Sequence, residues 1–230
     1  MNLILVFLLQ IGENYGNEHG ITVHKYGAHI FHTNNQRVFD WLSNFTTWVH
    51  FEHRVKAMLS TGELVTFPPN NETLAKVTDI IGTFYKPYTE KMWGVPFETV
   101  AKDVVDRVKI RADDGDLYFP NHRIQAVPEH GYVKLFERIL DHENINVILN
   151  TPFDHKLERD YAHVFASIPI DQYYDSKFGK LPYRSLDFTT VHLPCPRVFP
   201  VSVVNFTHTG PETRVIEWKN FPVHGVNERV

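Results

Sequence analysis

Patterns typical of strands and helices alternate along this chain, and that alternation limits its possible folds more than any other feature. Residues 54–68, RVKAMLSTGELVTFP, predict a β-hairpin that turns at Thr61-Gly62. Asn34 and Asn35 can cap a helix over residues 37–48. Residues 132–143, YVKLFERILDHE, have the spacing of an amphipathic helix that follows Gly131. Interleaved strands and helices of this kind predict a mixed α/β or α+β fold.

Further elements are predicted between and after these. Residues 71–92 have a helical pattern with an expected break near Pro87. The apolar runs INVIL (145–149) and HVFAS (163–167) are typical of strands in a buried sheet. The last part of the chain predicts strands within residues 183–193, 197–208 and 212–221.

Composition excludes several classes of function. The formal net charge of −4 gives no support for a nucleic-acid-binding surface, so any phosphate binding must come from a few placed arginines. The one cysteine, Cys195, excludes an internal disulfide framework and a multi-cysteine zinc site. It lies between two prolines without an adjacent base, which favours a plain thiol over a nucleophile.

The N-terminal apolar run, Leu3–Leu9, is too short to span a bilayer. It has neither the basic region nor the small-residue cleavage site of a signal peptide. We therefore expect a buried strand there and a cytoplasmic protein.

The stretch from Phe84 to Arg111 carries the strongest signal for a ligand. It brings four aromatic residues together within ten positions and follows them with Arg107 and Arg111. Aromatic rings stack on a flat base, and a guanidinium holds phosphate oxygens with two hydrogen bonds. The alternative interpretation is a core helix with a solvated basic end.

Two strand residues are further candidates. Arg214 lies in an alternating strand and either points inward or pairs on the surface with Glu212 or Glu217. Asn205, also within a strand, needs a polar partner from the protein or from a ligand.

Histidines of HKYGAHIFHT could suggest a metal cluster. The spacing of His24, His29 and His32 matches no common zinc pattern, so no metal site is predicted. A glycine in such a loop fits better as backbone that approaches a cofactor ring. The sequence contains no GxGxxG, GxxxxGK[ST] or GxSxG motif.

Several motifs, taken in order, resemble the UDP-galactopyranose mutase family. They are HKYGAHIFHT, YTEKMWG, an arginine fourteen residues after Trp93, SIPIDQYYDSKFG, PYRSLDF and TRVIEWK. The resemblance runs from about Ile11 to about Lys219. It implies a flavoprotein that interconverts UDP-galactopyranose and UDP-galactofuranose with reduced FAD. Flavin N5 attacks the anomeric carbon, UDP leaves, and the sugar opens, recloses as a furanose and regains UDP.

The resemblance also implies roles for individual residues. Arg107 and Arg214 correspond to the arginines that neutralise the diphosphate, and with His32 they form the catalytic set. The substrate site comprises Phe84, Tyr85, Tyr88, Thr89, Trp93, Tyr118, Asn205 and His53. The FAD site comprises Asn14, Gly27, His29 and Ile30, with His32 also on the loop that packs against the flavin.

The implied fold is an incomplete Rossmann-type dinucleotide domain with a shortened helical domain and a mixed β-sheet substrate domain. The expected division is a remnant FAD domain over 1–50, a hairpin over 51–70 and a shortened helical domain over 71–106. The substrate sheet takes 107–230, with FAD-domain elements returning at about 130–180.

The sequence also departs from the family. Met1 falls where the second strand of the dinucleotide unit would start, and Glu13 replaces a glycine of IGGN. Either the chain is a fragment of a partial or split gene, or it is a short member, as in a compact viral genome. In the second case, a homodimer or a second chain would supply the missing FAD-domain elements.

Two functions therefore remain open: an FAD-dependent mutase, and a non-catalytic or partner-dependent remnant that binds a UDP-sugar. A flavin amine oxidase is disfavoured because Arg107 and Arg214 would have no diphosphate to neutralise.

Overall fold

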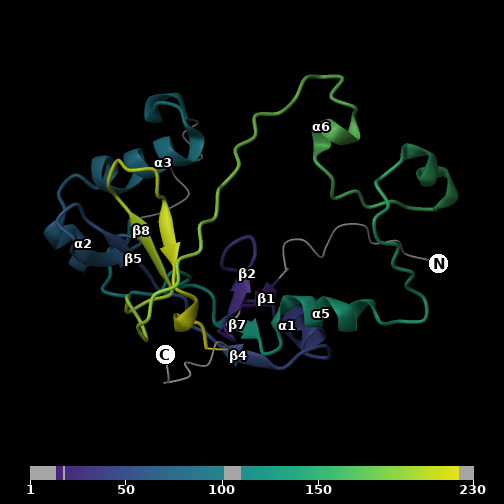
Figure 1. The fold of residues 1–230 in the computed structure, drawn as a ribbon, viewed down its shortest axis with the longest axis horizontal. Coiled ribbons are helices and arrows are strands. Elements are labelled where there is room, and N and C mark those ends of the chain that lie inside the picture. The colour runs from purple at the N-terminus through teal and green to yellow at the C-terminus, as the bar shows by residue number, and fades with distance from the viewer. Residues whose placement is uncertain (1–13, 18, 101–109, 223–230) are drawn as a thin grey trace.

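A computed structural model describes residues 14–17, 19–100 and 110–222 of the chain (Figure 1). Its strands are β1 (Asn14–Gly16), β2 (Thr22–His24), β3 (Phe31–Thr33), β4 (Trp48–His50), β5 (Val55–Met58), β6 (Leu64–Phe67), β7 (Ile124–Pro128), β8 (Val203–Phe206) and β9 (Arg214–Ile216). Its α-helices are α1 (Gln36–Leu42), α2 (Asn71–Lys76), α3 (Lys86–Trp93), α5 (Gly131–Leu140) and α6 (Ile170–Tyr173). Helices and several small sheets alternate, so the mixed class predicted from the sequence is confirmed.

A four-stranded mixed sheet in the order β6-β5-β8-β9 forms one half of the fold. Strands β5 and β6 are the predicted hairpin, and Gly62 in the turn has a φ of +85°, which glycine adopts without strain. Strand β8 lies parallel to β5 although it follows much later in the chain, and β9 then returns antiparallel to β8. The sheet therefore places two distant parts of the sequence side by side.

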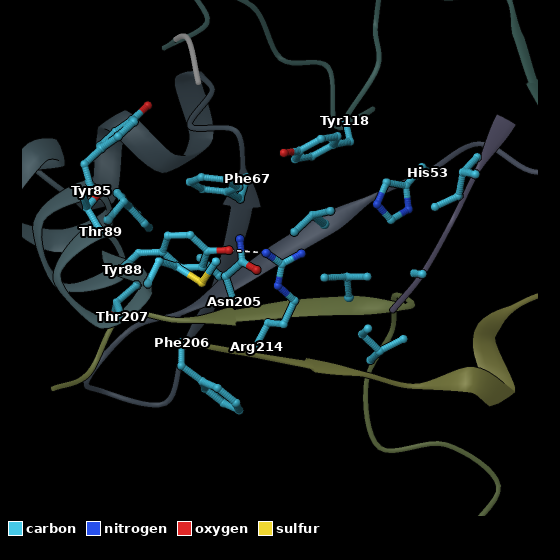
Figure 2. Close-up of a pocket in the computed structure, with 18 of the residues that line it drawn as sticks. His53, Phe67, Tyr85, Tyr88, Thr89, Tyr118, Asn205, Phe206, Thr207 and Arg214 are labelled. Atoms are coloured by element: carbon cyan, nitrogen blue, oxygen red, sulfur yellow. Dashed lines mark hydrogen bonds between the residues drawn. The ribbon is translucent and has the colours of Figure 1, made fainter. Parts of the chain in front are cut away.

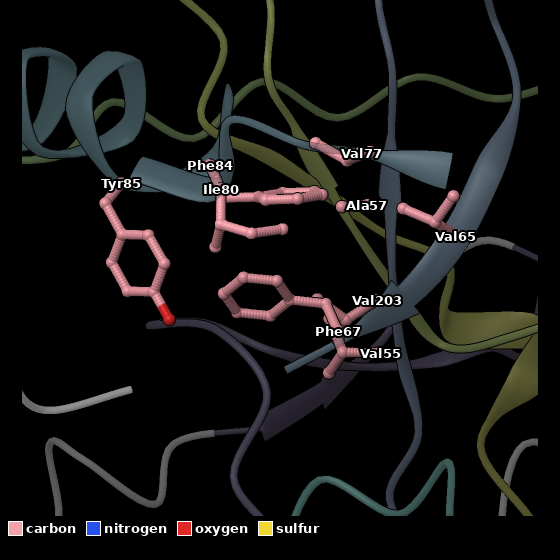
Figure 3. Close-up of a cluster of buried hydrophobic side chains, with 9 residues drawn as sticks. All are labelled: Val55, Ala57, Val65, Phe67, Val77, Ile80, Phe84, Tyr85 and Val203. Carbon is pink, nitrogen blue, oxygen red and sulfur yellow. The ribbon is translucent and has the colours of Figure 1, made fainter. Parts of the chain in front are cut away.

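The hydrophobic core lies on one face of this sheet (Figure 3). Alternate residues of a strand share a face, so Val55, Ala57, Val65, Phe67 and Val203 point to the same side. The segment between α2 and α3 covers them with Val77, Ile80, Phe84 and Tyr85. Phe84 and Tyr85 are thus partly core residues, as the alternative interpretation of the aromatic stretch required.

Residues 71–92, predicted as a helical segment with a break near Pro87, form two α-helices joined through a π-helical turn. The chain leaves helix α2 at Val77, and a π-helical turn (Ile81–Tyr85) then leads directly into α3. The predicted break near Pro87 is wrong because Pro87 lies in the first turn of α3, where its missing N–H is tolerated. Helix α3 ends at Gly94, whose φ is +65°.

Asn70 forms hydrogen bonds that link the start of α2 to the loop after the undescribed residues 101–109. Its side chain is 1% exposed, accepts a hydrogen bond from Thr73 N and donates one to Gly115 O. We expect Asn70→Ala to lower the free energy of unfolding by about 2–3 kcal/mol, because it removes a helix cap and leaves the buried N–H of Thr73 without its acceptor. Urea denaturation measures this, with the exposed Asn71→Ala as control at about 0.5 kcal/mol or less. Equal effects of the two changes would contradict the assignment.

A second, three-stranded sheet in the order β3-β7-β4 carries α1 and α5 beside it. Asn35 caps α1 as predicted, through its side chain and Val38 N. The helix ends at Leu42, well before the predicted residue 48, because Trp48 pairs with Pro128 in the sheet. The amphipathic helix after Gly131 is confirmed as α5.

Residues 141–200 run as an extended excursion that carries α6 (Figure 1). The strands predicted over 145–149, 163–167 and 183–193 are wrong for the described structure, where none of these ranges forms a strand. Apolar runs become buried strands only where neighbouring strands pair with them, and no described strand does so here. Phe165 and Tyr183 are 80% and 85% exposed as a result.

Within the described ranges, no helix combines the length and the apolar character needed to cross a bilayer. The N-terminal strand expected over Leu3–Leu9 lies outside the described residues.

Candidate functional site

A cavity of about 900 Å³ lies between the four-stranded sheet and α3, beside the hydrophobic core (Figure 2). The loop before β3 and the turn around Tyr118 form further walls. A stretch of the long excursion, Pro182 to Arg184, borders it as well. The cavity therefore gathers residues from distant parts of the chain.

The sheet supplies the floor of the cavity through side chains of alternating residues. Val55 and Ala57 of β5, Val203 and Asn205 of β8, and Arg214 and Ile216 of β9 line it. Asn205 lies directly opposite Arg214 in the antiparallel pair, so their side chains leave the sheet as neighbours on the same face. The Arg214 side chain borders the cavity, as one of the two alternatives open from the sequence required, although the residue itself remains exposed.

Helix α3 supplies an aromatic wall. Tyr85, Tyr88, Thr89, Met92 and Trp93 recur at the three- and four-residue spacing that places side chains on one helical face. The Arg214 guanidinium donates a hydrogen bond to the Tyr88 hydroxyl, and its carbon lies 5.7 Å from the centre of the Tyr88 ring. An arginine and an aromatic ring thus meet at the cavity, but the arginine is Arg214 from the sheet. Arg111, which the sequence pattern placed beside the aromatic residues, does not line the cavity, and its guanidinium bonds Asp113 and Leu117 O.

Lys91 fixes the sheet against α3. Its ammonium group donates hydrogen bonds to the carbonyl oxygens of Phe206 (3.0 Å), His208 (2.9 Å) and Glu212 (2.7 Å). Burial lowers the pKa of Lys91 from its ordinary value. Because these carbonyls lie in and around the connection from β8 to β9, Lys91 holds Arg214 near the helix that carries Tyr88.

Two buried polar atoms of the cavity have no hydrogen-bond partner among the described residues: Nδ1 of His53 and Oδ1 of Asn205. Buried polar atoms are normally paired, so unpaired ones in a cavity indicate contacts reserved for a ligand or for water. Burial, His32 and Arg214 together lower the pKa of His53 to about 4, so its imidazole is neutral at pH 7. Burial and then Tyr118 raise the pKa of Tyr85 to about 12, so its hydroxyl keeps its proton.

The charges of the cavity favour an anion. Among the described residues that line it, Arg184 and Arg214 are cationic and none is a carboxylate. Sequence reasoning missed Arg184, although the quoted motif PYRSLDF contains it. Its guanidinium lies so close to Gly94 that a β-carbon there would collide with it. Gly94 is needed for its φ of +65°, whereas the end of the flexible Arg184 side chain could move aside for a β-carbon.

The loop before β3 is held by hydrogen bonds within the loop and by one from α5. His29 N donates to His24 Nδ1 (3.2 Å), His29 Nδ1 contacts Gly27 O (2.7 Å), and Tyr132 donates to His29 O (3.2 Å). Gly27 has a φ of +96°, a conformation that favours glycine. The next residues, Ala28, His29 and Ile30, then line the cavity.

The cavity collects most of the residues singled out from the sequence. Those that line it are Arg214, His32, Phe84, Tyr85, Tyr88, Thr89, Trp93, Tyr118, Asn205, His53, His29 and Ile30. Gly27 precedes the lining residue Ala28, and the backbone of Asn14 pairs with His24 in the β1–β2 sheet. Arg107 lies outside the described residues. The individual roles of all these residues stay predictions.

A model of the family "UDP-galactopyranose mutase" matches residues 83–229. Among curated proteins, a "Probable UDP-galactopyranose mutase" from Klebsiella pneumoniae is 32% identical over 73% of this chain and 53% of its own length. A UDP-galactopyranose mutase from Mycoplasma pneumoniae is 29% identical over 90% of this chain and 64% of its own. A dTDP-fucopyranose mutase from Escherichia coli is 29% identical over 88% and 65%.

The chain spans roughly half to two-thirds of the length of these relatives. The family match nevertheless extends over more than half of this chain and includes the helix with Tyr88 and Trp93 and the strands with Asn205 and Arg214. The chain belongs to the UDP-galactopyranose mutase family.

Proposed function

We propose that the cavity binds a nucleoside-diphosphate sugar and that the chain carries the substrate side of an FAD-dependent UDP-galactopyranose mutase. The observation that carries this is the pairing of Arg214 with Tyr88 in a cavity whose described lining has two arginines and no carboxylate. The diphosphate needs cations, and the base needs an aromatic face. The two relatives named for UDP-galactopyranose favour that sugar nucleotide, and the third widens the class to a dTDP-sugar.

In this proposal Arg214 binds the diphosphate from the sheet, and Arg107, which lies outside the described residues, is the second arginine assigned to the diphosphate. Trp93 and the neighbouring α3 aromatics hold the uracil. The amide of Asn205 and the neutral imidazole of His53 offer unpaired hydrogen-bonding atoms to hydroxyl groups of the ligand. A neutral His53 can accept a hydrogen bond without adding charge beside the anomeric carbon.

The flavin ring of FAD would be held by His29, Ile30 and His32. Asn14 is a further residue proposed to contact FAD. Reduced FAD, when bound, supplies the nucleophile for the anomeric carbon of the sugar. The residues of this chain orient the sugar and neutralise the departing diphosphate. The domain division inferred from the sequence, with an incomplete Rossmann-type part, belongs to the same proposal.

Two binding measurements on the purified chain test the proposal. Titration calorimetry with UDP, dTDP and AMP is expected to give binding of UDP, weaker or equal binding of dTDP, and none of AMP. Absorbance between 350 and 500 nm after addition of FAD and gel filtration reports retained flavin. Failure to bind UDP or dTDP would sink the proposal for this cavity. Binding of UDP without FAD would support the non-catalytic or partner-dependent alternative.

Trp93→Ala is expected to weaken UDP binding by about 1–3 kcal/mol, the usual contribution of one base stacked on an aromatic ring. Trp93 is 41% exposed and lines the cavity, so its ring is available to a ligand. The matched control is Trp41→Ala, which removes a 53% exposed tryptophan from α1. Calorimetry should find UDP affinity unchanged in the control. An unchanged affinity in Trp93→Ala as well would remove Trp93 from the uracil site.

A further inference from the structure

Lys91 lies outside the cavity but is bound to the backbone that carries Arg214. It belongs to α3 and is not among the residues that line the cavity. Its ammonium group donates hydrogen bonds to the carbonyl oxygens of Phe206, His208 and Glu212. These residues belong to the end of β8 and to the connection 207–213, which leads into β9 at Arg214. Lys91 therefore contacts the chain just before Arg214.

The hydrogen-bonding capacity of Lys91 is fully used by this backbone. An ammonium group has three N–H donors and no acceptor, and each of the three carbonyl oxygens accepts one of them at 2.7 to 3.0 Å. An apolar side chain at position 91 would leave all three carbonyl oxygens without this donor. Lys91 thus works as an internal cation that gathers one stretch of backbone around itself.

The other hydrogen bonds of the connection do not reach α3. Thr207 Oγ1 donates to Met58 O (2.9 Å), which ties the start of the connection to β5. Phe206 N donates to Thr213 O (3.0 Å), which closes the connection on itself. Within the described residues, the hydrogen bonds that join the connection to α3 are therefore those of Lys91.

Strand β9 depends on this link because it is a short edge strand. In the order β6-β5-β8-β9 it pairs with β8 on one side only. The residue after its far end, Glu217, accepts hydrogen bonds from the backbone N–H groups of residues 198–199, both at 2.7 Å. Its start, which carries Arg214, follows directly on the connection that Lys91 holds. Strand ends with a single neighbour open more easily than central strands, so Lys91 stabilises the start of β9.

We propose that Lys91 is a positioning residue that sets ligand affinity from outside the cavity, because it fixes the backbone from which Arg214 reaches Tyr88. The anchoring of the connection 207–213 needs no ligand. The effect on affinity rests on the proposed function, in which Arg214 binds the diphosphate. Since Lys91 does not line the cavity, its contribution to affinity should disappear when Arg214 is absent.

Amide hydrogen exchange measured by NMR tests the anchoring without a ligand. The amide of Phe206 donates across the connection, so its exchange rate reports whether the connection stays closed. Lys91→Met keeps a long side chain without donors, and the Phe206 amide should then exchange about tenfold faster or more. The amides of β7 (Ile124–Pro128) should keep their native rates. An unchanged rate at Phe206, or an equal acceleration in β7, would overturn the proposal.

Two further variants complete this measurement. Lys91→Arg keeps a cation, but its planar fork cannot direct three hydrogens as an ammonium group does, so the exchange rate at Phe206 should fall between those of native protein and Lys91→Met. If Lys91→Met does not fold, Lys91→Arg is compared with native protein by the same criteria. The matched control is Lys134→Met, which removes an exposed lysine of α5 that pairs with Glu137, and the Phe206 amide should keep its native rate there.

UDP affinity supplies the second readout, measured by calorimetry in native protein, Lys91→Met, Arg214→Ala and the double variant. Lys91→Met is expected to weaken UDP binding by about five- to thirtyfold. In the Arg214→Ala background the same change should weaken it by about twofold or less, because the contact that Lys91 supports is already gone. An equal loss in both backgrounds would mean that Lys91 acts as a distant charge or as general support, which overturns its positioning role. Native protein that binds no UDP would refute the proposed function, and amide exchange alone would then decide whether Lys91 anchors the connection.

Discussion

Arg214→Ala is expected to weaken UDP binding by about 2–4 kcal/mol, roughly 30- to 1000-fold, because a charge-assisted contact to the diphosphate is left unmade. The Arg214 side chain leaves the sheet beside Asn205 and reaches the Tyr88 hydroxyl (Figure 2). Calorimetry at low and high salt measures the loss, and the dependence of affinity on salt should fall with it. Arg107→Ala should cause a loss of the same order.

The structure separates this loss from a loss of fold. Tyr88 and Arg214 are both at least partly exposed, so removing the guanidinium orphans no buried group, and the melting temperature should stay close to that of the native protein. Arg214→Lys keeps the charge but loses the planar fork, and should fall between native and Ala. Arg138→Ala is the control, because Arg138 donates to Phe45 O on another part of the molecule. UDP affinity that is unchanged in Arg214→Ala would remove the diphosphate from this side of the cavity.

Local sequence signals predicted the elements around the site well. The hairpin of β5 and β6 and the helix after Gly131 depend on turn residues and side-chain periodicity within a few positions, and both formed as predicted. The parallel pairing of β5 with β8 was not predictable, because it joins Val55 to Val203 across most of the chain. The apolar runs 145–149 and 163–167 failed for the same reason. Whether such a run becomes a strand depends on partners elsewhere.

The site was predictable to a similar degree. Resemblance to a family singled out Arg214, Tyr88 and Asn205, and the structure brings them to one cavity. Residues that act through others left no such signal. No sequence pattern predicted that the Lys91 ammonium group would bind three carbonyl oxygens. None predicted that His122 would hydrogen-bond His32, which lies ninety positions earlier in the chain. A single sequence shows residue types and spacings, whereas these contacts depend on the tertiary packing.

Acid is expected to destabilise the protein through His53, by about 2 kcal/mol at pH 5 and about 3 kcal/mol at pH 4. The pKa of His53 is lowered from 6.5 to about 4, chiefly by burial and then by the charges of His32 and Arg214. Between these two values the unfolded chain binds a proton at this histidine and the folded protein does not. The free energy of unfolding therefore falls as the pH drops below 6.5, and the fall levels off only below the folded-state pKa of about 4.

Comparison with His53→Gln isolates this contribution from the other groups that titrate in acid. The variant replaces the imidazole with a neutral amide, so its unfolding free energy lacks the His53 part of the pH dependence, whatever constant cost the substitution adds. Urea denaturation at pH 7.5, 6 and 5 gives both curves. The gap between native protein and variant should narrow, or reverse, by about 2 kcal/mol from pH 7.5 to 5. The control is His142→Gln, which changes an exposed histidine after α5 and should keep the pH dependence of the native unfolding free energy.

A difference in unfolding free energy between native protein and His53→Gln that is constant with pH would mean that His53 binds its proton as easily in the folded protein as in the unfolded chain. In that case its unpaired Nδ1 is reached by water, and the cavity is wetter at this end than the burial of His53 implies.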